Sequence, residues 1–173
     1  PAGVTVFLWQ DGGLIMLVDT GFGADEPNRA SALPLLLETV GLHPGYIDMV
    51  LLTHMHGDHI GCLLKDGKAA FPKAHVLVCK HELEFWTAPA TLVEKPDLKA
   101  NIMLVGKVWD AYGGRVKPFA FEDTVAPEIV AHPAQGHTPG HTMFVLASKG
   151  ERLIFWGDLV HGAALQFSNP EIC

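Results

Sequence analysis

The chain has 173 residues, of which 49% are hydrophobic and 18% charged, a profile of a globular domain with a hydrophobic core rather than of a disordered segment. Its formal net charge of −7 and its 12 scattered Lys and Arg residues argue against a nucleic acid as the main partner, because phosphate binding needs clustered positive charge. Three widely spaced cysteines (Cys62, Cys79 and Cys173) exclude a disulfide framework and a Cys-x-x-Cys centre.

No apolar run reaches the length of a membrane-spanning helix, and no signal peptide pattern is visible. The chain starts at Pro1 without a Met, so either a leader was removed or the sequence is a fragment. The localisation therefore stays unknown, with a cytoplasmic location slightly favoured over a periplasmic or secreted one. We expect a small-molecule substrate as the partner, without nucleic acid or membrane, and a homodimer is an open alternative.

The first half of the chain alternates strand and helix patterns. Asp11-Gly12-Gly13 separates two apolar, β-prone runs, which is typical of a hairpin. A segment with helical spacing follows, with Ser31 as a candidate N-cap and Gly41 just past its end. In chain order, these patterns predict strands at residues 4–10 and 14–19, a helix at 31–40, a strand at 49–52 and the beginning of a helix within 60–64.

The second half of the chain begins with strand and helix patterns and ends with strand patterns. Its longest helical segment places Ile102, Val105 and Trp109 on one apolar side and closes at Gly113-Gly114. In chain order, we expect a strand at 74–79, helices at 81–87 and 97–112, and strands at 116–121, 128–131, 142–147 and 152–156. This interspersed pattern predicts an α/β or α+β layered fold, with residues 1–173 forming one domain.

Four candidate metal ligands lie within six residues, directly after an expected apolar strand. His54 and His56 are two residues apart, and in extended backbone such side chains project to the same side. Gly57 lets the chain turn, so that Asp58 and His59 can face a neighbouring point. Imidazole and carboxylate groups suit zinc, iron, manganese or cobalt. The cluster therefore predicts a metal site.

Two later motifs bring further ligands to strand ends. Gly136-His137-Thr138-Pro139-Gly140-His141 precedes one expected strand, and Phe155-Trp156-Gly157-Asp158 places a carboxylate just past another. Three strand ends that each deliver a ligand can assemble one site at the edge of a sheet.

Together, the Thr53-His54-Met55-His56-Gly57-Asp58-His59 motif and these two motifs, preceded by Leu17-Val18-Asp19-Thr20-Gly21, resemble the metallo-β-lactamase superfamily in content and order. The resemblance implies an αββα sandwich, incomplete at the C-terminus of this chain. It also implies two divalent metal ions, with zinc favoured and iron, manganese or cobalt as alternatives.

The resemblance also implies a role for each matching residue. Asp58 would be a metal ligand and would also be catalytic, because it would pass a proton to the leaving group. Asp19 would support the histidine loop, and His141 would be structural rather than a ligand. The first ion would be bound by His54, His56 and His137 and the second by Asp58 and His59, with Asp158 bridging both.

Local matches resemble one branch of the superfamily, that of methyl parathion hydrolase and the N-acyl homoserine lactonases. They lie in residues 71–74, 84–86 and 157–160. In that branch aromatic side chains wall the leaving-group pocket, and Phe22 and Trp86 are the matching candidates for substrate binding. Ordinary packing is the alternative for each of them.

The implied function is a metal-dependent hydrolase that uses metal-bound hydroxide to cleave an ester, a lactone or a phosphotriester. One alternative is an oxidoreductase resembling the mononuclear iron persulfide dioxygenases, and another is a non-catalytic metal-binding fragment. No Gly-x-Ser-x-Gly motif supports a serine hydrolase.

One ligand of the family pattern has no counterpart in the sequence. Dinuclear members need a further histidine near the chain end, and no histidine follows His161. His161 is itself a poor substitute by sequence spacing, because it lies only three residues past Asp158. We therefore expect a piece of a longer protein, with a complete first metal site and a second site short of one ligand.

Overall fold

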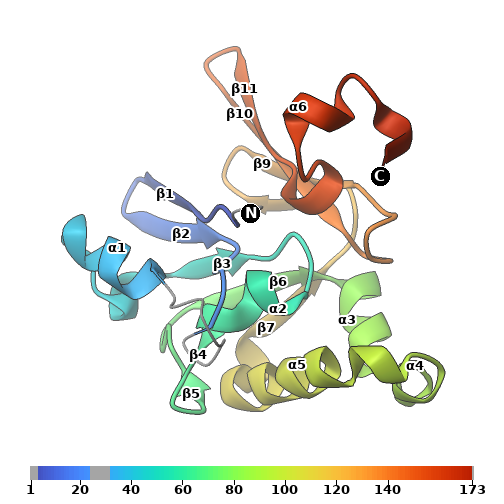
Figure 1. Ribbon diagram of the computed structural model, residues 1–173. Coiled ribbons are helices and arrows are strands. Elements are labelled where there is room, and N and C mark those ends of the chain that lie inside the picture. The colour runs from blue at the N-terminus through green and yellow to red at the C-terminus, as the bar shows by residue number, and fades with distance from the viewer. Residues whose placement is uncertain (1–3, 24–31, 173) are drawn as a thin grey trace.

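The computed structural model describes residues 4–23 and 32–172 and arranges their strands mainly in two sheets that pack face to face (Figure 1). The five-stranded sheet has the order β1-β2-β3-β6-β7, with β1 Phe7–Asp11, β2 Leu14–Val18, β3 Met49–Leu51, β6 His75–Cys79 and β7 Val116–Phe119. The four-stranded sheet has the order β11-β10-β9-β8, with β8 Thr124–Ala126, β9 Ile129–Pro133, β10 Thr142–Ser148 and β11 Glu151–Phe155. A small hairpin pairs β4 Leu64–Lys65 with β5 Lys68–Ala69.

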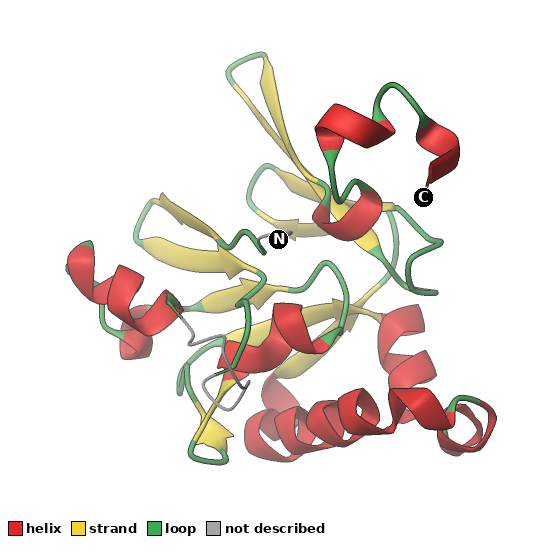
Figure 2. Cartoon of the chain, in the orientation of Figure 1, coloured by secondary structure: helices red, strands yellow, loops and turns green. Residues whose placement is uncertain are grey.

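The helices lie mostly along the five-stranded sheet, as Figure 2 shows for the longest of them. They are α1 Leu33–Thr39, α2 Gly57–Ile60, α3 Lys80–Thr87, α4 Pro89–Glu94, α5 Lys99–Tyr112 and α6 Ala163–Gln166. Helix α5 packs Val105, Val108 and Tyr112 against the sheet, whereas Trp109, expected on its apolar side, is 44% exposed. In the described part of the chain, no helix is long and apolar enough to cross a membrane.

The strands of the five-stranded sheet bury both faces by alternation. In β2, Leu17 points to the helices, whereas Met16 and Val18 point to the four-stranded sheet. Phe144 and Phe155 approach them from the opposite sheet, so a second apolar core fills the space between the sheets. Because successive residues of a strand face opposite sides, the short apolar runs of the sequence suit a sheet covered on both faces. The layered α/β fold is thereby confirmed.

Strand direction explains where the functional residues gather. Strands β2, β3 and β6 run parallel, so their carboxyl ends meet at one edge of the sheet. Asp19, Thr53 and Glu82 follow these three ends within a few residues. The loop after β9 carries His137, and the loop after β11 carries Asp158. Both loops reach the same edge.

The structure contains every strand that the sequence predicts and all but one of the predicted helices in place, with small shifts at their ends. Five short elements were not predicted, namely β4, β5, β8, α4 and α6. The helix expected to begin within residues 60–64 was wrong in position, because α2 begins at Gly57 and a 3₁₀ turn covers Gly61–Leu63. The proposed N-cap, Ser31, lies outside the described residues.

Candidate metal centre

The structure brings the three ligands expected for the first ion together. His54 and His56 extend from the loop after β3, and His137 comes from the loop after β9. The His54 Nε2 atom lies 3.0 Å from His56 Nδ1, and His137 Nε2 lies 2.9 Å from the same His56 atom. One ligand atom of each residue lies within 4.8 Å of the others. Three nitrogens at these distances can surround one divalent ion.

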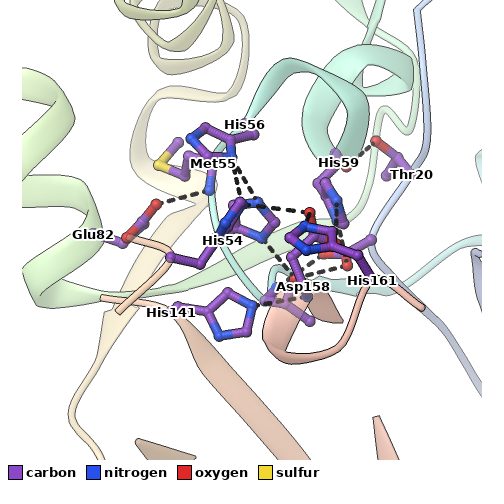
Figure 3. Close-up of polar contacts among 12 residues, drawn as sticks. Thr20, His54, Met55, His56, His59, Glu82, His141, Asp158 and His161 are labelled. Carbon is purple, nitrogen blue, oxygen red and sulfur yellow. Dashed lines mark hydrogen bonds and ion pairs between the residues drawn. The ribbon is translucent and has the colours of Figure 1, made fainter. Parts of the chain in front are cut away.

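Asp158 stands between the two expected metal positions. Its Oδ1 atom lies 3.2 Å from His59 Nε2 (Figure 3). Its Oδ2 atom lies 3.4 Å from His137 Nε2. His54, His59 and Asp158 form a second group whose ligand atoms lie within 4.8 Å of one another. Asp158 thus turns one oxygen toward His59 and the other toward His137, and its role as a ligand shared by two ions stays a prediction.

Asp19 supports the histidine loop, as the sequence predicts. It follows β2 with a φ of 58°, a left-handed conformation that Asp tolerates better than most residues, and it is 3% exposed. Its Oδ1 accepts a hydrogen bond from the Thr53 backbone N–H at 2.9 Å, and its Oδ2 accepts one from the Thr53 hydroxyl at 2.8 Å. The same Oδ2 lies 2.8 Å from His59 Nδ1. Asp19 therefore fixes both the start of the loop and the orientation of His59.

His141 supports the Asp158 loop and belongs to none of the ligand groups found in the described residues. It is fully buried, with Nδ1 2.9 Å from the Ala134 carbonyl oxygen. Its Nε2 accepts a hydrogen bond from the Asp158 backbone N–H at 3.0 Å. Both ring nitrogens are thus engaged, in agreement with the structural role expected for His141.

Glu82 was not predicted to take part in the site. It lies in the first turn of α3 and is fully buried, and its carboxylate joins the two histidine loops. Oε1 accepts hydrogen bonds from Met55 N and Trp86 Nε1 at 3.0 and 2.7 Å. Oε2 accepts them from Thr138 Oγ1 and Gly140 N at 2.7 and 2.9 Å. Met55 lies between His54 and His56, and Thr138 follows His137, so one carboxylate holds the backbone on both sides of the first ligand group.

The electrostatics of the site prepare most of its histidines for metal binding. Burial lowers the pKa of His54, His56 and His137, and neighbouring imidazoles lower it further. These shifts favour the neutral form of the rings, which is the form that binds a metal. For Asp158, burial opposes ionisation, but the close approach of His59 outweighs it and lowers the pKa of the carboxyl group.

His59 behaves differently from the other histidines. Burial opposes its protonation, but the carboxylates of Asp158 and Asp19 at its two nitrogens outweigh burial and raise its pKa to about 10. Its buried Nε2 has no hydrogen-bond partner among the described residues, although Asp158 lies near it. A buried nitrogen that faces a carboxylate without bonding to it suits a position for a cation. The donor set and this nitrogen both fit divalent metal ions.

Metal binding is expected to release about one proton per chain at pH 6, because His59 must lose its proton to become a ligand. His54, His56 and His137 should add less, because their pKa values are lowered. Calorimetric titration with zinc in buffers of different ionisation enthalpy measures this number. A value near zero would contradict the protonated state of His59.

The raised pKa of His59 also makes the stability of the metal-free fold depend on pH. Its contribution to the free energy of unfolding is complete below pH 6.5 and disappears as the pH rises through about 10.

The other predicted site residues lie around this centre. Asp58 and Phe22 line a cavity of about 500 Å³ next to His59 and Asp158. The Asp58 carboxylate belongs to none of the ligand groups in the described chain, so its metal-binding and catalytic roles stay predictions. Trp86 is 1% exposed and packs edge-to-face on His56 with ring centres 5.6 Å apart. In this structure Trp86 therefore packs against the candidate ligand His56. Its role in substrate binding stays a prediction.

Comparison with known proteins identifies the family. Residues 1–170 match the model of the metallo-β-lactamase superfamily. A Caenorhabditis elegans protein described as a β-lactamase-like protein 2 homolog is 26% identical over 160 residues, which cover 92% of this chain and 45% of that protein.

Two solved structures are similar over almost the whole chain. AidC, a dizinc quorum-quenching lactonase in complex with a product, has a TM-score of 0.87 and 28% identity, with 97% of this chain and 60% of AidC covered. AbOPH, a hydrolase of the β-lactamase superfamily, has a TM-score of 0.86 and 33% identity, with 97% of this chain and 60% of AbOPH covered. The chain thus spans 60% of each of these two proteins. By its motifs, its fold and these matches, the chain belongs to the metallo-β-lactamase superfamily.

Proposed function

We propose that the protein is a metal-dependent hydrolase that cleaves an ester, a lactone or a phosphotriester and uses two divalent ions, with zinc favoured. The observation that carries the proposal is the position of Asp158, whose Oδ1 faces His59 and whose Oδ2 faces His137. When bound, such ions supply Lewis-acid activation of water and of a substrate oxygen.

The residues of the chain divide the remaining work. One ion would be held by His54, His56 and His137. The other would be held on the side of His59, with Asp158 between the two groups. Asp58 offers a carboxylate at the wall of the cavity, where it can take a proton from water and return it to a leaving group.

A lactone is the substrate class with the most support. The structural similarity to the lactonase AidC supports it, although AidC is a longer chain. The lining of the cavity also supports it, because Phe7, Phe22 and Leu153 give the space beside the site an apolar wall that suits an acyl chain.

The test is turnover by the purified protein loaded with zinc or cobalt, with an N-acyl homoserine lactone, an aryl ester and an aryl phosphotriester as substrates. We expect hydrolysis of at least the lactone, lost after treatment with a chelator and restored by zinc. Absence of turnover on all three substrates by metal-loaded protein would overturn the proposal and favour a non-catalytic metal-binding chain. Oxygen uptake with a persulfide by the iron-loaded protein would favour the dioxygenase alternative.

A further inference from the structure

His161 lies on the solvent side of the metal centre. It follows the 3₁₀ turn Gly157–Leu159 that carries Asp158, and its side chain is 52% exposed. Its Nε2 atom lies 3.1 Å from Asp158 Oδ2, as Figure 3 shows. His161 also lines the cavity beside His59. An exposed imidazole thus points at the carboxylate that joins the two ligand groups.

The surroundings of His161 form a third group of possible ligands. Ligand atoms of His137, Asp158 and His161 lie within 4.8 Å of one another. The same Asp158 oxygen lies 3.4 Å from His137 and 3.1 Å from His161, and the two imidazole rings are 5.2 Å apart. Two imidazole nitrogens and one carboxylate oxygen around one point are a donor set for zinc or cobalt.

A histidine beside a carboxylate is not by itself a metal site, as the pair of His132 and Glu122 illustrates. His132, in β9, lies 3.0 Å from a Glu122 oxygen, and this pair belongs to none of the ligand groups in the described chain. What distinguishes His161 is the second imidazole, that of His137, on the same carboxylate oxygen. The third donor turns a surface ion pair into a possible coordination site.

We propose that His161 is a metal ligand that binds, through Nε2, the ion held by His137 and Asp158. This inference rests on the proposed function in one respect, namely that the centre binds divalent ions. It revises the argument from sequence spacing, by which the position of His161 only three residues past Asp158 disfavoured a shared ion. The backbone explains the revision, because the 3₁₀ turn ends at Leu159 and Val160 is extended (φ −135°, ψ 110°), which returns the His161 side chain toward Asp158.

Cobalt binding to the full chain tests this ligand without any measurement of activity. The variants are His161→Ala, His161→Gln and the control His132→Ala, which removes an exposed imidazole beside a carboxylate elsewhere. Glutamine can still donate a hydrogen bond to Asp158, but it supplies no imidazole. Chelator competition gives the affinity, and proton NMR of the cobalt protein counts the shifted ring N–H signals of bound histidines.

We expect both His161 variants to bind the cobalt ion held by His137 and Asp158 at least about tenfold less tightly, the lower end of the loss seen when supporting residues of metal sites are changed. Both should also lose one shifted N–H signal, and His132→Ala should lose neither. If His161→Gln matches the unchanged protein in affinity and signal count, His161 is only a hydrogen-bond partner and the inference is wrong. If no variant and not even the unchanged protein binds cobalt, the proposed function fails as well.

Discussion

Replacing His137 by alanine is expected to remove nearly all hydrolytic turnover while the protein stays folded. His137 belongs to two of the three ligand groups, so its loss weakens binding on both sides of Asp158. Its side chain is 26% exposed and lies in a loop, which makes the change mild for the hydrophobic core. An ion contributes several kcal/mol to the transition state. At 1.36 kcal/mol for each factor of ten, kcat/KM should fall by roughly 10³-fold or more.

The measurement is kcat/KM for a lactone with metal in excess, together with thermal unfolding of the metal-free protein. His132→Ala serves as the matched control, because His132 is also a histidine beside a carboxylate but lies away from the centre. The control should keep its activity, and both variants should unfold near the temperature of the parent. Activity within tenfold of the parent for His137→Ala would refute the assignment of His137 as a ligand.

The gathering of the candidate ligands at one edge of the sheet could be predicted from sequence, because it follows from strand ends. His54 and His56 follow a short apolar strand, and parallel strands bring their carboxyl ends to one edge of a sheet. The later motifs of His137 and Asp158 follow other strands in the order of a known family. Local pattern and motif order were therefore enough for most of the elements and for bringing these side chains together, whereas their roles as metal ligands stay predictions.

The interactions that the sequence could not show depend on contacts between distant segments. Glu82 is one of 19 acidic residues, and nothing in its local pattern distinguishes it from an exposed helix residue. Its role appears only when Met55 and Thr138, 27 and 56 residues away, meet its carboxylate. The orientation of His161 depends on where a 3₁₀ turn ends, which spacing alone does not determine. Strand β8 has three residues, too few for a visible alternation.

Replacing Glu82 by alanine is expected to lower both the stability of the fold and the affinity for metal. The change leaves Met55 N, Trp86 Nε1, Thr138 Oγ1 and Gly140 N without their acceptor in a buried place. A buried donor without a partner costs about 1–3 kcal/mol, so the free energy of unfolding should fall by at least about 3 kcal/mol. Both histidine loops also lose their shared anchor, and metal affinity should fall about 10–100-fold, as for other groups that orient metal ligands.

Comparison of variants separates the effect on metal from the effect on folding. Glu84→Ala is the matched control, because it removes a carboxylate from the same helix, and the Glu84 side chain is 72% exposed. It should change neither the free energy of unfolding nor the metal affinity. Glu82→Gln keeps one oxygen acceptor but turns an amide N–H toward two donors, so it should fall between parent and Glu82→Ala. Thr138→Val removes a single hydrogen bond to Glu82 and should lower metal affinity with a smaller loss of stability, because the carboxylate keeps its other three donors. If Glu82→Ala, at a temperature where it is fully folded, binds zinc as tightly as the parent, Glu82 stabilises the fold without positioning the ligands.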